Sequence, residues 1–354
     1  MDPDDLYISA CATWLPPALG TEQAVAAGLC TRAEAGRAGM ESVTVATDTS
    51  APEMAARAAR TALDRAGCAP ADVGLLLHAT LYEQGHDLWS PASYIQREAL
   101  GSDFADCPAI EVRQVSNGGM ASLQLAAAYL RAGTDRPAAL LTAGDVFCLP
   151  GFDRWRSDPG TVYADGGAAL VLSREAGFAR LRGLATFSEP RLEGMHRGRQ
   201  SFAPDPSGLR RRVDLKACQD GFMRDTGRGT VVGLVSGGAG RAAAGALAQA
   251  GLELGDIARF VLPHMGRRRL EASYFGPLGI LPEQSTWPWS RGVGHLGGGD
   301  QFAGLTYLVE NKEVAPGDHC LLMGVGAGFT WTCAVVEILH LPDWLVSGER
   351  WDTD

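Results

Sequence analysis

The residue best placed for covalent chemistry is Ser116, which lies between a predicted strand at residues 110–115 and a predicted helix at residues 120–130. Backbone N–H groups at the start of a helix, at the positive end of its dipole, stabilise a developing alkoxide or oxyanion. Two glycines, Gly118 and Gly119, follow the serine and would let a substrate chain approach closely. The same pattern fits a plain helix cap, so this segment alone leaves both roles open.

A serine hydroxyl is a weak nucleophile until a base removes its proton, so a base must come from another part of the chain. Two histidines are candidates, His264 in FVLPHMGRRRL and His295 in GHLGGGDQ. Asp300 follows His295 by five residues and could orient an imidazole and stabilise its cation, which gives a Ser-His-Asp relay. The structural alternatives are a satisfied core histidine for His264 and a loop-capping carboxylate for Asp300.

The elements that would position these residues occur twice along the chain. Residues 50–79 predict a capped Ala-rich helix, a break at Gly67 and a buried strand from Val73 to Ala79. Residues 240–263 repeat this order of helix, break and strand, as a duplicated α/β unit would. We therefore expect two similar halves, residues 1–178 with the nucleophile and residues 179–354 with the histidines and Asp300. A polar, Arg-rich insertion is expected at about 189–225.

Several segments, in order from residue 39 to residue 337, resemble the ketoacyl-acyl-carrier-protein synthase III branch of the thiolase-fold enzymes. They are GMESVTVATDTSAPEMAARAARTAL, the Ser116 segment, YADGGAALVLS, FVLPHMGRRRL and VAPGDHCLLMGVGAGFTWTCAVVEI. The resemblance implies an α/β chain with the thiolase fold. In that fold, duplicated βαβαβαββ halves pack as a five-layered α/β/α/β/α sandwich, usually in a homodimer.

The resemblance also implies roles for individual residues. Ser116 stands where the family keeps a nucleophilic cysteine and would take the acyl group, and His264 matches the catalytic histidine. The backbone N–H groups of Ser116 and Ala327 resemble the oxyanion hole. His295 replaces the family asparagine, and a serine in place of a thiol needs a stronger base. His196, inside the insertion, is a further possible site residue.

The donor implied by the resemblance is an acyl thioester of a carrier-protein phosphopantetheine or of coenzyme A, with no bound cofactor and no metal. The basic run Arg267, Arg268 and Arg269 would dock the acidic carrier protein, unless it is simply a solvated helix face. The second substrate would be a small-molecule acceptor. The eight cysteines contain no CxxC pair, so the chain shows no zinc or disulfide pattern.

Three functions remain open at this point. With its serine and Asp300, the chain resembles a natural-product subset of the family that contains priming enzymes and deoxysugar acyltransferases. These two residues favour the first function, transfer of an acyl group to a hydroxyl or amine. The second function is a priming ketosynthase that condenses a starter acyl group with malonyl-carrier protein and releases carbon dioxide. The third is a noncatalytic partner subunit of a synthase complex.

The bulk composition excludes some classes of function. A net charge of −10 and a pI near 5.2 argue against a general nucleic-acid binder, which needs a basic surface. The first residues contain no basic and apolar leader. No apolar run is expected to approach the roughly 20 residues that a spanning helix needs. We therefore expect a cytoplasmic enzyme without a membrane partner.

Overall fold

The computed structural model of the chain describes residues 5–102, 106–199, 202 and 212–345. Its main sheet has nine strands in the order β5-β4-β6-β7-β1-β8-β11-β10-β9. The strands of the first half are β1 (Tyr7–Trp14), β4 (Val73–Ala79), β5 (Ala109–Val112), β6 (Ala138–Asp145) and β7 (Gly166–Ser173). Those of the second half are β8 (Ala179–Ser188), β9 (Ile257–Val261), β10 (His319–Gly326) and β11 (Thr330–Ile338). A separate two-stranded antiparallel sheet is formed by β2 (Ala18–Gly20) and β3 (Ser42–Thr44).

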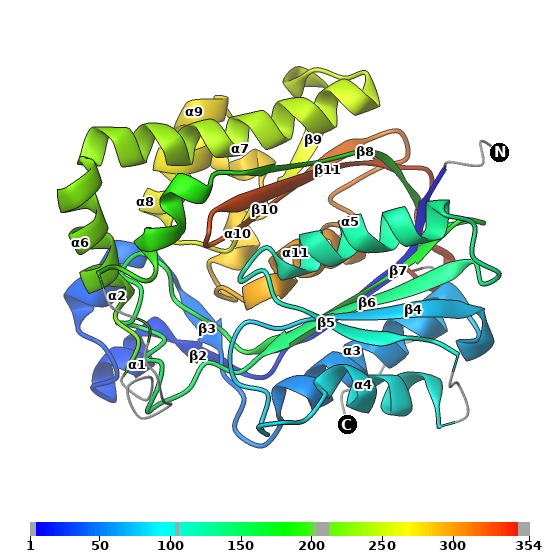
Figure 1. Cartoon of the computed structure of the whole chain (residues 1–354), viewed down its shortest axis with the longest axis horizontal. Helices are drawn as coiled ribbons and strands as arrows, with labels where there is room; N and C mark the ends of the chain where they lie inside the picture. The colour runs from blue at the N-terminus through cyan, green and yellow to red at the C-terminus, as the bar shows by residue number, and fades with distance from the viewer. Residues whose placement is uncertain (1–4, 103–105, 200–201, 203–211, 346–354) are drawn as a thin grey trace.

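Helices and strands alternate in five layers (Figure 1). Helices α3 (Ala51–Ala66) and α4 (Pro91–Leu100) cover the outer face of the first-half strands. Helices α5 (Gly118–Arg131) and α11 (Asp300–Glu310) lie between the two sets of strands, and α7 (Arg228–Ala250) covers β8 and β11 from the far side. This arrangement confirms the predicted thiolase-type sandwich.

The predicted repeat is present in both halves. Helix α3 begins after Ser50, whose backbone N–H and hydroxyl both donate to the Glu53 carboxylate, a cap of about 1 kcal/mol. The helix ends at Gly67, which has a φ of 57° that a side chain would disfavour, and β4 follows with every residue buried. Helix α7 ends in the same way at Gly251, with a φ of 68°, and leads into β9.

Helix α7 differs from the sequence expectation in one respect. It has 23 residues and, by length and composition alone, is long and apolar enough to cross a membrane, as the core helix of a globular protein can also be. Its inner side packs against β8 and β11, so the sandwich itself accounts for an apolar helix here.

The remaining helices lie outside the packed layers of α3, α4, α5, α7 and α11. They are α1 (Thr21–Ala26), α2 (Arg32–Ala38), α6 (Leu215–Thr226), α8 (Arg267–Leu270), α9 (Gly276–Leu278) and α10 (Trp287–Ser290). The proposed division at residue 178 falls between β7 and β8. Helix α6 and the 3-10 turn Pro190–Met195 belong to the expected insertion, and residues 200–201 and 203–211 of that insertion lie outside the described part.

Candidate active site

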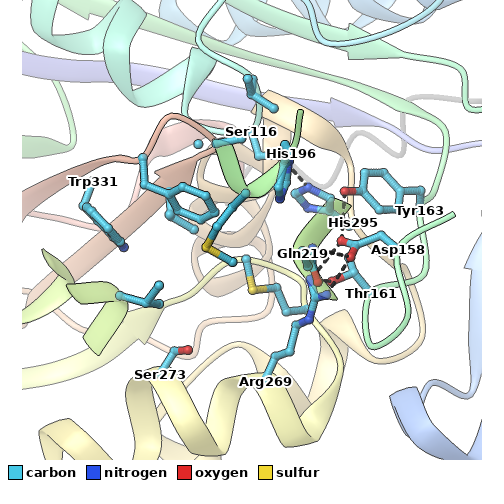
Figure 2. A pocket seen from close by; sticks show the side chains of 18 of the residues that line it. Ser116, Asp158, Thr161, Tyr163, His196, Gln219, Arg269, Ser273, His295 and Trp331 are labelled. Carbon is cyan, nitrogen blue, oxygen red and sulfur yellow. Dashed lines mark hydrogen bonds and ion pairs between the residues drawn. The ribbon is translucent and has the colours of Figure 1, made fainter. Parts of the chain in front are cut away.

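A cavity of about 190 Å³ lies beside Ser116 and is built from both halves of the chain (Figure 2). One part of its wall is polar and includes Asp158, Thr161 and Arg269. Another part is apolar and includes Val235 of α7 and Trp331 of β11. A concave cavity with a few convergent polar groups is the usual form of a small-molecule site.

Ser116 sits on a strained turn between strand and helix. Strand β5 ends at Val112 rather than at the predicted residue 115, because the chain turns sharply before α5. Val115 has a φ of 48°, a left-handed conformation that a β-branched residue rarely adopts, at a typical cost of about 1–3 kcal/mol. The turn brings Ser116, two residues before Gly118, to the cavity wall.

The glycines after Ser116 serve the packing of the protein rather than a substrate chain. A side chain on Gly119 would clash with the carbonyl oxygen of Gly298, in the loop that carries His295. A side chain on Gly118 would press on Ala79 at the end of β4. These glycines therefore let α5 approach the histidine loop, which corrects the expected role in substrate approach.

Ser116, His295 and Asp300 form a continuous chain of hydrogen bonds. The Ser116 Oγ lies 2.8 Å from the Nε2 of His295, and the His295 Nδ1 lies 2.6 Å from an Oδ2 of Asp300 (Figure 2 draws the first two residues). A carboxylate accepts only, so the Nδ1 of His295 carries the proton and its Nε2 accepts from the serine hydroxyl. This arrangement can remove a proton from Ser116.

Asp300 is buried, yet it is well supplied with donors. Backbone N–H groups of His264 and Leu296 each donate to it at 2.8 Å. Burial by itself would raise the pKa of the Asp300 carboxyl. The nearby His264 and His295, together with these hydrogen bonds, outweigh burial and hold the pKa below its usual range. Asp300 is thus an anion at neutral pH and can hold the His295 tautomer.

His264 lies behind Asp300 and does not line the cavity. Its side chain is fully buried, its Nδ1 lies 3.0 Å from the carbonyl oxygen of Gly294, and its ring meets Trp289 edge-on. Its Nε2 has no partner among the described residues. Burial lowers the pKa of His264, so the ring is neutral near pH 7. Of the two candidate bases, only His295 contacts Ser116.

Ala327 also lines the cavity, in the turn between β10 and β11. A side chain on Gly326 would clash with the carbonyl oxygen of Gln114, so this glycine lets the turn lie close to the Ser116 segment. The predicted oxyanion residues, Ser116 and Ala327, therefore share one cavity wall. Their role in holding an oxyanion stays a prediction.

The basic run on α8 is divided in the structure. Arg269 turns inward and binds both oxygens of Asp158, at 2.6 and 2.8 Å, and the Thr161 hydroxyl at 2.8 Å (Figure 2). Arg267 pairs with Glu271 at 2.9 Å near the surface, and Arg268 is exposed. Arg269 is thus part of the cavity wall, and the docking prediction rests on Arg267 and Arg268.

Replacing Arg269 by Gln should destabilise the fold by roughly 3 kcal/mol, because it leaves the buried Asp158 carboxylate without its partner. Arg267→Gln removes only a surface pair and should change stability by less than about 1 kcal/mol. Denaturant unfolding of both variants measures the difference.

Burial would raise the pKa of Asp158, but Arg269 holds it below its usual value. The stability advantage of the wild type over Arg269→Gln should therefore persist above about pH 4 and fade as the pH falls further. Equal stability of the two variants would contradict this assignment.

Tyr163 and Asp158 are among the cavity residues that were not foreseen from the sequence. The Tyr163 ring packs edge-on against His295 with centroids 4.8 Å apart, and its hydroxyl lies 3.3 Å from Asp158. The His295 backbone also pairs with the chain on either side of Tyr163. Tyr163 lies in the recognised YADGG segment, but Asp158 lies in a loop with no pattern of its own. His196, the possible site residue, does line the cavity.

Comparisons with known proteins agree with this fold. Residues 247–338 match the family model for the 3-oxoacyl-[acyl-carrier-protein] synthase III C terminal. The beta-ketoacyl-[acyl-carrier-protein] synthase III of Rhizorhabdus wittichii is 29% identical over 287 residues, which are 80% of this chain and 83% of that protein. The structure of the ChlB3 acyltransferase is 38% identical, with a TM-score of 0.90, and covers 96% of this chain and 99% of its own.

The chain belongs to the ketoacyl-acyl-carrier-protein synthase III family. The FabH structure from Pseudomonas aeruginosa, at 20% identity, shares the fold with a TM-score of 0.75, and the match covers 95% of this chain and 99% of FabH. The similar proteins are ketoacyl-acyl-carrier-protein synthases and an acyltransferase, so the chain is an acyl-transferring enzyme of the synthase III type. By the resemblance drawn from the sequence, its serine and its His-Asp pair are the departures from the family that bear on the reaction.

Proposed function

We propose that the chain is an acyltransferase that works through an acyl-Ser116 intermediate. The donor would be an acyl-carrier-protein or coenzyme A thioester. The acceptor would be a hydroxyl or amine of a secondary metabolite, for example a deoxysugar of an antibiotic. The observation that carries the proposal is the chain of hydrogen bonds from Ser116 through His295 to Asp300. A serine needs such a base, and the relay supplies one.

In the first step, the Ser116 Oγ attacks the thioester carbonyl carbon while its proton passes to the Nε2 of His295. The carbon–sulfur bond then breaks, and the leaving thiolate takes that proton from His295. The charge on the intermediate oxygen would fall to the N–H groups of Ser116 and Ala327. Asp300 keeps the imidazole oriented and stabilises its transient cation throughout.

Two observations favour transfer over decarboxylative condensation. The similar ChlB3 protein is described as an acyltransferase. In condensing enzymes of this fold, two histidines, or a histidine and an asparagine, assist loss of carbon dioxide. Of the matching pair in this chain, only His295 lines the cavity, and His264 is fully buried behind it.

The fate of the carboxyl carbon of malonate distinguishes the candidate functions. The enzyme is incubated with an acyl thioester and malonyl-carrier protein labelled at the free carboxyl, with and without hydroxylated acceptors. The proposal expects acyl esters or amides and no release of labelled carbon dioxide above the level of Ser116→Ala. Enzyme-dependent release together with a β-ketoacyl product would establish the priming ketosynthase instead. No turnover of any donor would favour the noncatalytic partner subunit.

We also propose that a carrier protein docks at Arg267 and Arg268. These two side chains lie on α8 next to Arg269, so a partner bound there would sit beside the cavity wall. Carrier proteins are acidic, and this chain with its net charge of −10 would repel them elsewhere. Charge reversal at both positions should raise KM for acyl-carrier protein and leave KM for acyl-coenzyme A unchanged.

A homodimer is the assembly that we propose, with β5 at its interface. This strand forms one edge of the main sheet, and its Ile110 is 49% exposed, with Leu125 of α5 at 52%. An exposed edge strand with apolar side chains is a site for pairing with another chain. Sedimentation velocity of the wild type should give a dimer, and Ile110→Asp should give a monomer.

A further inference from the structure

His196 is a second histidine in the cavity, and the Ser116 relay does not use it. It follows the turn Pro190–Met195 and lines the same cavity as Ser116 and His295 (Figure 2). Within the described residues, neither of its ring nitrogens has a protein hydrogen-bond partner. The buried rings of His78, His264 and His295 each have at least one. Both nitrogens of His196 are therefore available to a molecule in the cavity.

The position of His196 is tied to the turn that carries Ala327. The backbone N–H of Glu189 donates to the Phe329 carbonyl at 2.8 Å, which anchors the start of the His196 segment to that turn. The His196 ring then meets the Phe329 ring edge-on, with centroids 5.4 Å apart. An acyl group on Ser116 with its oxygen toward Ala327 would thus have His196 held at a fixed position in the same cavity.

His196 is neutral in this setting. Burial lowers the pKa of its imidazole; Asp158 nearby raises the pKa and Arg269 lowers it, and the net shift is downward. A neutral imidazole presents one N–H donor and one acceptor nitrogen. It can therefore donate one hydrogen bond and accept another at the same time.

A ring that donates one hydrogen bond and accepts another suits the acceptor substrate better than the thioester substrate. The reacting group of a thioester has a carbonyl oxygen and a sulfur but no N–H or O–H, so it cannot satisfy the acceptor nitrogen of the ring. A hydroxyl or amine has both a hydrogen and a lone pair, and it can bond to either nitrogen. A site built to bond a hydroxyl or amine discriminates strongly against molecules that lack it.

We propose that His196 binds the hydroxyl or amine acceptor and orients it toward acyl-Ser116. This inference rests on the proposed acyltransferase function. In the transfer step, the acceptor proton passes to the Nε2 of His295, and the acceptor oxygen or nitrogen bonds to the acyl carbon. The bond from that carbon to the Ser116 Oγ then breaks, and the Oγ takes the proton from His295. His196 holds the acceptor and undergoes no net change.

The test separates the two half-reactions. Acetyl- and malonyl-coenzyme A serve as donors and hydroxylamine as the probe acceptor, with water as its competitor. Intact mass follows acylation of Ser116, and the ratio of hydroxamate to free acid reports the partition. The variants are His196→Phe, which keeps a ring without nitrogens, and His196→Gln, which keeps a donor and an acceptor. His340→Phe changes an exposed histidine as the matched control.

We expect His196→Phe to acylate within about twofold of the wild type and to lower the hydroxamate-to-acid ratio about tenfold, as loss of one hydrogen bond would. The wild-type dependence on hydroxylamine should saturate, and His196→Gln should recover much of the ratio. An unchanged hydroxamate-to-acid ratio in His196→Phe overturns the inference, and so does acylation slowed as much as transfer. Neither result contradicts catalysis through Ser116. A wild type that no thioester acylates refutes the proposed function itself.

Discussion

Asp300→Asn should lower the rate of Ser116 acylation on the order of 10⁴-fold, the loss that a wrong histidine tautomer causes in relays of this type. The amide can donate to the Nδ1 of His295, so the proton moves to Nε2, which then cannot accept from Ser116. The single amide oxygen also cannot serve the backbone N–H groups of both His264 and Leu296. Single-turnover acylation, followed by intact mass, measures the effect.

Asp300→Asn needs a folding control, because the buried Asp300 carboxylate also binds backbone N–H groups of its surroundings. Cooperative thermal unfolding and unchanged circular dichroism would show that the variant is folded. The pKa of Asp300 is held below its ordinary value. Its carboxylate should therefore stay ionised, and continue to support wild-type acylation, until the pH falls below about 4. A folded Asp300→Asn enzyme within tenfold of the wild type would contradict the relay.

His295→Asn should have an equal or larger effect, on the order of 10⁴-fold or more, because the serine loses its base. By the sequence resemblance, the change restores the asparagine expected of the family at this position, so it tests why this chain departs from it. His264→Asn should slow acylation at most about tenfold, the scale of one supporting hydrogen bond. Single-turnover rates of the two variants give the comparison.

A second substitution makes this prediction sharper. Ser116→Cys placed in the His295→Asn background recreates the family pair of cysteine and asparagine. A thiol is partly ionised near neutral pH without a strong base, so acylation should partly return. Loss of acylation in His264→Asn as large as in His295→Asn would show that His264 is the base and that our assignment is wrong.

The regular elements were predictable because their local signals agree with their tertiary surroundings. Ser50, Gly67 and the mainly apolar run from Val73 to Ala79 mark a cap, a stop and a buried strand, and the structure has each of them. The end of β5 was not predictable from apolar residues alone. It depends on the left-handed turn at Val115, which the packing of the Ser116 segment imposes.

The site was predictable in its residue types and not in its contacts. Ser116, His295 and Asp300 could be named from chemistry and resemblance, but the choice between the histidines depends on a contact across 179 residues of sequence. The direction of Arg269 depends in the same way on Asp158, 111 residues earlier in the chain. A run of three arginines gives no sign of which one turns inward, since α8 has only four residues.

The most direct test of the account is a search for the acyl-enzyme. The wild type and Ser116→Ala are incubated with a panel of acyl-carrier-protein and acyl-coenzyme A thioesters, and intact mass and peptide mapping follow. The account predicts an acyl adduct on Ser116 in the wild type and no adduct in the variant. An adduct that persists in Ser116→Ala, or none with any donor, would contradict catalysis through Ser116.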